Sequence, residues 1–453
     1  MSRKNRRRKP VPEGEFEASI TDLSEDGRGV ARLDGKVCFI AGSLPGEQVR
    51  FSYSRMNKNA DEGFVTAVIQ ASPDRVNPPC AHFGDCGGCS LQHLSADAQI
   101  TLKQQRLLET LKRIGKVEPE QLAAAVRGAS QAYRRRARLS VKYLPSEDRV
   151  LVGFRDRSGR RLARIQQCQV LDARVGQKLT ILAECIAGLS IRDQIPQIEI
   201  ACADRVALVF RVLKTPTAQD LLKLDSLATS EGFDVYLQTG GPKTIAPMRP
   251  PASPLHFSPD GSQTRLRFEP TDFVQIHAEV SQKAVLQALD WLQPRGGENV
   301  LELFCGLGNF SLPLARAGAR LTAVEGEPAL VQRARENALA QGASIRFEAA
   351  DLFAPFEEHA WSRQDFDAVL LDPPRAGAEV AAEWIGKQGI ARVLYVSCHP
   401  GTLARDAARL VHEYGYRLLR TGVMDMFPHT AHVESMALFV HSSVGDSPHA
   451  SGN

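Results

Sequence analysis

The period of alternation between apolar and polar positions changes along the 453-residue chain, and these changes predict separate domains. Residues 16 to 70 alternate at period two, in short runs separated by Asp-Gly and Pro-Gly turns, which predicts a small five-stranded β-barrel. Residues 95 to 125 carry leucines at helical spacing and predict one or two helices. Residues 138 to 260 predict a mixed α+β region with antiparallel strands, and prolines between 247 and 254 indicate its end.

The C-terminal region alternates apolar strands with helical patterns, which is typical of an α/β domain. A helix is expected over 278–292, and five strands are expected to begin near residues 299, 321, 345, 366 and 392. Polar or reactive side chains follow these strands, and the carboxyl ends of parallel strands form one edge of such a sheet. The pattern therefore predicts a Rossmann-like domain with its functional site along that edge.

A chain of this length exceeds what one hydrophobic core supports, so several domains are expected. We expect a basic disordered tail over 1–12, a β-barrel over 13–72, a central domain over 73–262, the α/β domain over 263–443 and a disordered tail over 444–453.

Charge adds a nucleic-acid hypothesis to this picture, although the net charge is only +4. A basic arm precedes the barrel, and residues 134 to 164 hold eleven Lys and Arg against three acids. Such clusters attract phosphate, while an ordinary solvated surface is the alternative for either one alone. The arm consists of Arg3, Lys4, Arg6, Arg7, Arg8 and Lys9.

No run of about 18 apolar residues and no secretory signal is found, so neither a membrane span nor export is expected. Nine cysteines without a signal point to a reducing, cytoplasmic compartment, where clustered cysteines indicate a metal site or catalysis. Three of them, Cys80, Cys86 and Cys89, have C-x5-C-x2-C spacing among Pro and Gly. A fourth ligand is expected because zinc and iron–sulfur cubanes take four, and Cys168 is preferred over Cys185 and Cys202. Spacing leaves zinc, iron–sulfur and chance clustering open.

The strongest cofactor signal is the strand and Gly-rich turn from Asn299 to Asn309. The second strand ends at Glu325, a carboxylate that suits a ribose diol. The third ends at Asp351, and the fourth ends in Asp372-Pro-Pro. NAD is the alternative cofactor, but the missing third glycine and the Asp-Pro-Pro sequence favour S-adenosylmethionine.

A thiol and a carboxylate then predict the reaction. Cys398 ends the fifth strand and Glu434 begins another apolar run. A thiolate that adds to C6 of uracil makes C5 nucleophilic, and a base then removes the C5 proton after methylation. Cys398 is the expected nucleophile and Glu434 the base; a buried structural thiol and a surface carboxylate are the alternatives. Cys305 is a competing thiol for the nucleophile, but it lies in the cofactor loop. Rival functions are amino-methylation through Asp372-Pro-Pro, which needs no thiol, and RNA binding without catalysis.

These motifs together resemble the TrmA-type RNA uracil-C5 methyltransferases over residues 10 to 440, and the barrel resembles a TRAM domain. The motifs are Asp26-Gly-Arg-Gly, the cysteine set, Tyr133-Arg-Arg-Arg-Ala-Arg, Phe273-Val-Gln275, Phe304-Cys-Gly-Leu-Gly-Asn309, Asp372-Pro-Pro-Arg, Ser397-Cys398 and His432-Val-Glu434. His399 and His277 depart from the resemblance, since both replace an asparagine usual in the family.

The resemblance implies a [4Fe-4S] cluster on Cys80, Cys86, Cys89 and Cys168. It implies S-adenosylmethionine contacts at Gln275, Phe304, Asn309, Glu325, Asp351 and Asp372. It also implies a uridine of 23S ribosomal RNA, held by the central domain and flipped into the pocket, as the substrate of a monomer. Residues 95 to 125 are expected against the catalytic domain. A sister activity on another ribosomal or transfer RNA uridine stays open.

Overall fold

The computed structural model describes residues 11–250, 253–262 and 264–443. The basic arm at residues 3 to 9 and the tail expected at 444–453 lie outside them. The chain divides into two compact units. Unit 1 comprises Met1–Leu102, Phe154–Ile165 and Phe427–His432, and unit 2 comprises Lys103–Gly153, Gln166–Met426 and Val433–Asn453.

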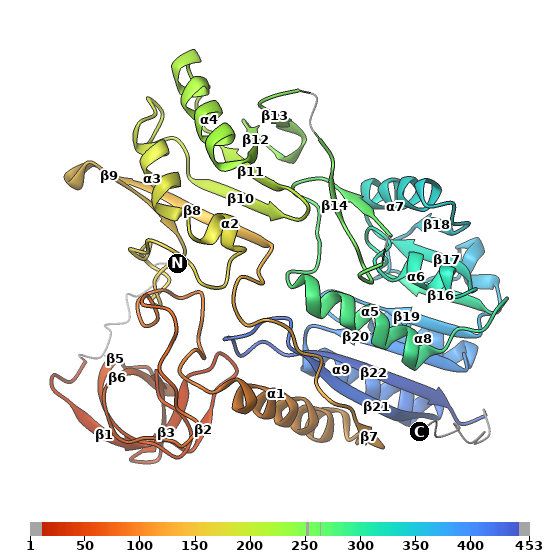
Figure 1. Cartoon of the computed structure of the whole chain (residues 1–453). Helices are drawn as coiled ribbons and strands as arrows, with labels where there is room; N and C mark the ends of the chain where they lie inside the picture. The colour runs from red at the N-terminus through yellow and green to blue at the C-terminus, as the bar shows by residue number, and fades with distance from the viewer. Residues whose placement is uncertain (1–10, 251–252, 263, 444–453) are drawn as a thin grey trace, which may run out of the picture. The chain divides into compact units, whose positions relative to one another are not determined.

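Unit 1 contains a six-stranded sheet in the order β1-β5-β6-β4-β3-β2, whose strands curl around a shared interior (Figure 1). One face of each strand is apolar, so that side chains such as Ile40, Val49 and Phe51 are fully buried. The sheet has one strand more than the five expected, because the two-residue β2 pairs with β3. The strands are β1 (Phe16–Ser19), β2 (Asp22–Leu23), β3 (Gly29–Leu33), β4 (Lys36–Ala41), β5 (Gln48–Arg55) and β6 (Ala60–Gln70).

The predicted helical region forms α1 (Ala96–Thr110), which continues as the π-helix η1 (Leu111–Gly115). Its leucines Leu107 and Leu111 belong to the same buried cluster as the strands of the α/β domain. At the end of η1, a Cβ on Gly115 would lie 2.7 Å from the Ala404 carbonyl oxygen, so only glycine permits this close approach. From Lys103 onward this segment of the N-terminal half is thus part of the core of unit 2.

A second six-stranded sheet, also in unit 2, has the order β13-β12-β11-β10-β8-β9. Its strands are β8 (Arg136–Leu144), β9 (Arg149–Gly153), β10 (Gln197–Cys202), β11 (Val206–Arg211), β12 (Phe233–Gln238) and β13 (Ile245–Pro247). Its helices are η2 (Pro145–Glu147), α2 (Ala173–Gly176), α3 (Leu179–Ala187), α4 (Ala218–Glu231) and η3 (Pro242–Thr244). The mixed α+β architecture predicted for this region is present, with one parallel pair, β11 and β12.

The α/β domain is built on an eight-stranded sheet in the order β18-β17-β16-β19-β20-β22-β21-β7 (Figure 1). The first five of these strands are parallel, and β22 runs antiparallel to β20 and β21. The strand order reverses between β16 and β19, which is where open α/β sheets place their ligands. The strands are β7 (Gln121–Leu122), β16 (Asn299–Leu303), β17 (Arg320–Glu325), β18 (Arg346–Ala349), β19 (Ala368–Leu371), β20 (Arg392–Ser397), β21 (Tyr416–Met424) and β22 (Glu434–His441).

Helices cover this sheet, and a short hairpin of β14 (Leu255–Phe257) and β15 (Leu266–Phe268) precedes it. The helices are α5 (Ala278–Leu292), α6 (Ser311–Arg316), α7 (Pro328–Ala340), η4 (Ala360–Arg363), α8 (Glu379–Gln388), α9 (Pro400–Ala408) and η5 (Arg409–Glu413). The helix predicted over 278–292 is confirmed. None of the helices within the described residues combines the length and apolarity that crossing a membrane requires.

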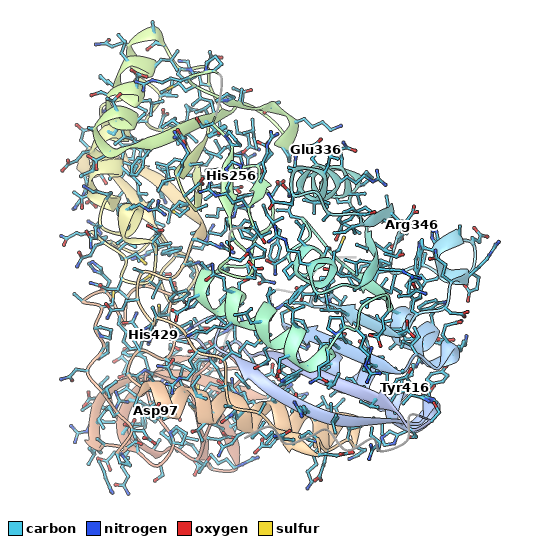
Figure 2. All side chains as sticks on the ribbon, turned by 45° about the vertical axis from the view of Figure 1, so that its right-hand side comes forward. Asp97, His256, Glu336, Arg346, Tyr416 and His429 are labelled. Atoms are coloured by element: carbon cyan, nitrogen blue, oxygen red, sulfur yellow. The ribbon has the colours of Figure 1, made fainter. Side chains whose placement is uncertain are left out.

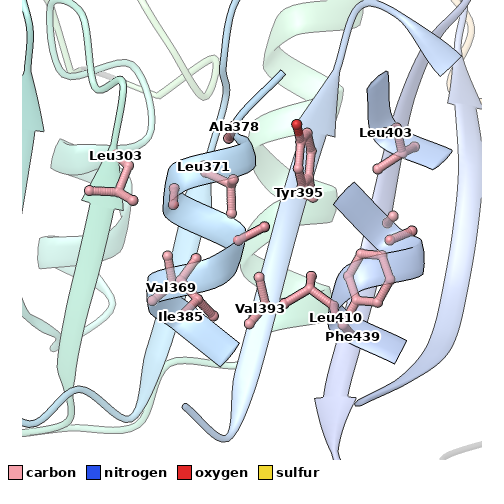
Figure 3. Packing of buried hydrophobic residues seen from close by; sticks show 14 of the residues in the cluster. Leu303, Val369, Leu371, Ala378, Ile385, Val393, Tyr395, Leu403, Leu410 and Phe439 are labelled. Atoms are coloured by element: carbon pink, nitrogen blue, oxygen red, sulfur yellow. The ribbon is translucent and has the colours of Figure 1, made fainter. Parts of the chain in front are cut away.

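Apolar side chains of neighbouring strands, aliphatic and aromatic, form a buried layer against the covering helices (Figure 3). Val369, Val393 and Tyr395 face Ile385 and Leu403 of the covering helices, and all five are fully buried. Burying a side chain of this size contributes about 1.5–3 kcal/mol. This packing holds the carboxyl ends of the parallel strands at one edge of the sheet. The residues that follow the strands therefore lie along the same edge.

Candidate functional site

The register between β20 and β22 brings Cys398 and Glu434 together. Ser397 pairs with Ser435 across the two antiparallel strands. Cys398 follows the first serine and Glu434 precedes the second, so the two occupy the next facing positions along the ladder. Directly opposed residues in such a ladder have Cβ atoms about 4.5–5.5 Å apart. Both side chains are partly buried.

Two charges from the loop after β19 act on this pair. Burial, followed by the charges of Glu434 and Asp372, raises the pKa of the Cys398 thiol to about 11 against the opposing effect of Arg375. Burial and Asp372 also raise the pKa of Glu434 well above its usual range, whereas Arg375 and Lys103 lower it. The thiol, two carboxylates and a guanidinium therefore form one electrostatically coupled group.

Asp372 is hydrogen-bonded to Gln275, which lies in the segment before α5. The Gln275 side-chain amide donates to its Oδ2 at 3.2 Å. Burial raises the pKa of Asp372 to about 7, and this hydrogen bond opposes the rise. The Gln275 carbonyl in turn accepts from the Arg135 Nε at 2.6 Å, so a buried arginine fixes the backbone that positions the amide.

The Gly-rich turn after β16 has an unusual backbone. Phe304, Gly306 and Gly308 all have positive φ, at 64°, 55° and 91°. For phenylalanine this conformation is strained, and such strain concentrates at functional sites. Glu325 Oε2 accepts from the Gly306 N–H at 3.0 Å and its Oε1 accepts from the Glu327 N–H at 3.1 Å. The carboxylate thus joins the turns after β16 and β17.

The other residues expected at the cofactor line the same strand ends. The Asn309 Oδ1 is buried and has no hydrogen-bond partner among the described residues, so it can accept a hydrogen bond from a ligand. Asp351 accepts from the Phe353 N–H at 2.9 Å, and the Phe353 ring lies 5.8 Å from that of Phe304. An exposed aromatic side chain and an unsatisfied amide are what an adenosine-containing ligand requires.

The four cysteines expected to hold a cluster fall in both units. Unit 1 contains Cys80, Cys86 and Cys89, and unit 2 contains Cys168. The Gly88 N–H donates to the Cys86 Sγ at 3.4 Å. Within the described parts of the chain, no group of three or more His, Cys, Asp or Glu is placed to hold a metal ion. A bound cluster is therefore not confirmed.

The two histidines that depart from the family pattern cap helices. His399 Nδ1 accepts from the Thr402 N–H at 3.2 Å at the start of α9. His277 Nδ1 accepts from the Val280 N–H at 3.4 Å at the start of α5. Asparagine is a preferred N-cap because its side-chain oxygen accepts the same bond. Each histidine thus substitutes for the cap that an asparagine would supply.

The arginines of the motif before and within β8 differ in burial. Arg135 is buried, and its guanidinium lies 4.7 Å from the centre of the Phe257 ring. Arg136 is mostly buried and lies 4.0 Å from Glu199, whereas Arg138 is exposed. The motif therefore contributes more to packing within unit 2 than its composition predicted.

A cavity of about 850 Å³ adjoins this packing, and its lining comes from the segment before β8, the start of α2, the end of β10, β14 with its following loop, and the start of α5. Its lining includes Tyr133, Arg174, Arg265, His256 and His277, and His256 is labelled in Figure 2. The Tyr133 and His277 rings stack at 4.8 Å. The residues that line it include neither of the two expected catalytic side chains. Arg135 borders the cavity and also bonds the Gln275 backbone, which links the cavity to the site.

Sequence reasoning missed three charged residues near Glu434. Lys103 of α1 and Asp425, after β21, form a buried ion pair with a 2.6 Å separation. No local pattern distinguishes this lysine from an ordinary helix-surface residue. Arg375 was within the quoted Asp-Pro-Pro-Arg sequence, and its position three residues after Asp372 was the available signal.

Comparison with known proteins agrees with this geometry. A family model described as tRNA (Uracil-5-)-methyltransferase matches residues 95–442, and a TRAM domain model matches residues 14–50. The chain is 49% identical over 437 residues to 23S rRNA (uracil(1939)-C(5))-methyltransferase RlmD of Alkalilimnicola ehrlichii, covering 96% of this chain and 98% of that protein. It is 46% identical to the protein of the same name from Methylococcus capsulatus, with the same coverage.

Among solved structures, the chain is similar to the Pyrococcus abyssi tRNA (uracil-54, C5)-methyltransferase, determined in complex with S-adenosyl-L-homocysteine. The TM-score is 0.72 at 23% identity, covering 94% of this chain and 99% of that one. At this low identity the likeness concerns the fold alone, and it extends over nearly the full length of both chains.

Proposed function

The chain belongs to the tRNA (Uracil-5-)-methyltransferase family, and we propose from this membership that it methylates C5 of one uridine in 23S ribosomal RNA. The target corresponds to the uridine 1939 named for its relatives. The observation that carries the proposal is the β20–β22 register, which places Cys398 beside Glu434 at the carboxyl end of the sheet.

Cys398 is the proposed nucleophile. Its Sγ adds to C6 of the flipped uracil, and the C5=C6 electron pair moves into an enolate that makes C5 nucleophilic. The raised pKa of Cys398 favours the thiol in the free protein, so the thiol proton passes to solvent water as the Sγ–C6 bond forms. The Arg375 cation favours the thiolate of Cys398, and its side chain is exposed.

S-adenosylmethionine supplies the methyl group that C5 accepts. Gln275, Phe304, Asn309, Glu325, Asp351 and Asp372 are the residues proposed to hold it. Support comes from the unsatisfied, buried Asn309 Oδ1 and from the positive φ of Phe304. Glu325 holds the two turns together through backbone amides, so its substitution would disturb the turn as well as any ribose contact.

Glu434 is the proposed base that completes the reaction. It removes the C5 proton, the C–H electron pair re-forms the C5=C6 bond, and the C6–Sγ bond breaks to release Cys398. Burial gives the Glu434 carboxylate a high proton affinity, and the cations Arg375 and Lys103 favour the ionised form that accepts the proton. Asp372, held by Gln275, lies beside it and raises that affinity further.

A [4Fe-4S] cluster on Cys80, Cys86, Cys89 and Cys168 is a separate proposal, which rests on the resemblance and on the donor set. Four cysteine thiolates are the usual ligands of such clusters. The Gly88 amide beside the Cys86 sulfur supports the assignment. The barrel of unit 1 and the central sheet of unit 2 are proposed as the RNA-binding parts, in the cytoplasm, with the chain acting as a monomer.

The decisive experiment combines the purified chain, S-adenosylmethionine and a transcript of its own 23S ribosomal RNA around the expected uridine. The product is digested and analysed for 5-methyluridine at that position. Methylation that requires Cys398 supports the proposal. Retained methyl transfer by a Cys398→Ala variant would instead support an amino-methyltransferase that uses Asp372-Pro-Pro, and RNA binding without methylation would support a non-catalytic role.

A further inference from the structure

A buried ion pair between Lys103 and Asp425 lies beside the proposed base but belongs to none of the motifs discussed above. The Lys103 Nζ lies 2.6 Å from the Asp425 Oδ1, and the lysine side chain is only 1% exposed. Taking a lysine out of water to this extent costs several kcal/mol, so its charge requires a partner. The partner is separated from it by 322 residues in sequence.

The position of this pair follows from the second register of β22. Met424 pairs with Glu434 across β21 and β22, and Asp425 is the next residue after Met424. The Asp425 N–H donates to the Val126 carbonyl at 2.8 Å, which fixes the backbone at this point. Lys103 therefore reaches from α1 to the end of β21, next to the first residue of β22.

We propose that Lys103, fixed by Asp425, is a positioning residue that keeps Glu434 in the anionic, proton-accepting form needed to release the methylated uridine. The proposal rests on the function assigned above to Glu434. Its physical basis is that the buried cation, which pairs with Asp425 beside the Met424–Glu434 pair, also acts electrostatically on Glu434 and opposes the effect of Asp372. An α1 lysine thus contributes to the final chemical step from outside the α/β sheet.

Several charged groups surround Glu434 and the ion pair. They are Lys103 and Arg106 of α1, Asp372 and Arg375 after β19, Cys398 after β20 and Asp425 after β21. Lys103 and Arg375 are the cations that lower the proton affinity of Glu434, and Asp372 raises it. Arg375 is exposed, so salt and water screen it more than they screen the fully buried Lys103.

The step affected is elimination. Ionised Glu434 takes the C5 proton, the C–H electrons form the C5=C6 bond, and the Cys398 sulfur leaves with the C6–S electrons. Without the lysine charge, Glu434 holds its own proton to higher pH. A nearby opposite charge lowers a carboxyl pKa by about one unit or more, so removing that charge raises the pKa again. At a pH below the pKa, each unit of this rise lowers the ionised fraction about tenfold.

The test uses the full-length Lys103→Met variant, the RNA transcript and S-adenosylmethionine. The decay of the covalent protein–RNA adduct is followed across pH on denaturing gels. The variant is expected to accumulate adduct at pH 7, decay about tenfold more slowly than wild type there, and recover at higher pH. An adduct decay curve that coincides with wild type at every pH would overturn the proposal.

A double variant separates this role from a structural one. Lys103→Met alone leaves Asp425 buried and unpaired, whereas Lys103→Met with Asp425→Asn removes both charges and restores a neutral core. If the pair only stabilises the fold, the double variant regains the wild-type pH profile, which overturns the proposal. If Lys103 acts on Glu434, the profile of the double variant stays shifted toward high pH.

Lys112→Met is the matched control, since Lys112 follows α1 and pairs with Glu118 at the surface. Its pH profile is expected to match wild type. The wild-type reaction separates the two hypotheses: an absence of 5-methyluridine contradicts the proposed function itself, whereas normal wild-type turnover with an unshifted Lys103→Met profile contradicts only the role of Lys103.

Discussion

Cys398 and Glu434 are 36 residues apart in sequence but occupy neighbouring positions across β20 and β22, one step beyond the Ser397–Ser435 pair. The two strands are antiparallel, so a single register decides this proximity. A shift by one residue would turn Glu434 to the other face of the sheet.

Replacing Glu434 with Gln keeps the shape of the side chain but removes the base. The variant is expected to transfer at most one methyl group per protein and to retain the RNA on Cys398, with turnover reduced about 10²–10⁴-fold. Denaturing gels with labelled methyl groups measure the trapped adduct. Cys398→Ala is the control that should form no adduct, and repeated turnover by Glu434→Gln would contradict the assignment.

Alkylation of Cys398 in the free protein should be slow at neutral pH and rise through a midpoint of about 11, because burial and two carboxylates disfavour the thiolate. Peptide mapping after iodoacetamide treatment measures this site among the nine cysteines. Glu434→Gln should lower the midpoint, since it removes one of the opposing charges. Rapid alkylation of wild-type Cys398 at neutral pH, as expected of a thiolate, would refute this electrostatic description.

The folded protein should lose stability as pH rises through the pKa of Asp372, about 7 in the folded state against an ordinary value of 3.8. A raised folded pKa means that the protonated form stabilises the fold, fully below about pH 4 and progressively less toward pH 7. Asp372→Asn lacks this dependence, so its unfolding free energy should improve relative to wild type between pH 5 and 8. Urea denaturation measures it, with the exposed Asp290→Asn as control.

His399→Asn and His399→Ala form a matched pair for the cap of α9. Asparagine supplies a side-chain acceptor for the Thr402 N–H and should leave stability close to wild type. Alanine removes the acceptor and should cost about 1 kcal/mol in unfolding free energy. Denaturant titration of the three proteins distinguishes a capping role from a catalytic one, since a catalytic histidine would lose activity in both variants at unchanged stability.

Anaerobic purification should give a brown protein with four irons per chain if the proposed cluster is present. Cys86→Ser should then lose iron, weaken RNA binding and leave S-adenosylmethionine affinity intact. Cys185→Ser, at a position in α3, should retain the iron. A colourless preparation with stoichiometric zinc would replace the iron–sulfur assignment, and loss of cofactor binding with intact RNA affinity would contradict the separation of roles.

The amino-acid pattern alone predicted the helices and strands of the α/β domain and the polar or reactive side chains at the strand ends. Period-two and 3.6-residue patterns predicted the strands from Asn299 to Ser397 and helix 278–292, because one-sided burial imposes those periods. The order of polar strand ends then predicted where Glu325, Asp372 and Cys398 would lie, since parallel strands share one edge.

Tertiary structure alone decided the contacts between distant segments. Nothing local in α1 marks Lys103 for Asp425, and nothing in the arginine motif marks Arg135 for burial against Phe257. Helix propensity and charge are local properties, whereas burial depends on which element packs above a residue. Gly115 shows the same limit. A side chain at this position would clash with the backbone of Ala404, which is almost 300 residues away in sequence. The sequence therefore specified which groups could react, and the packing specified which of them meet.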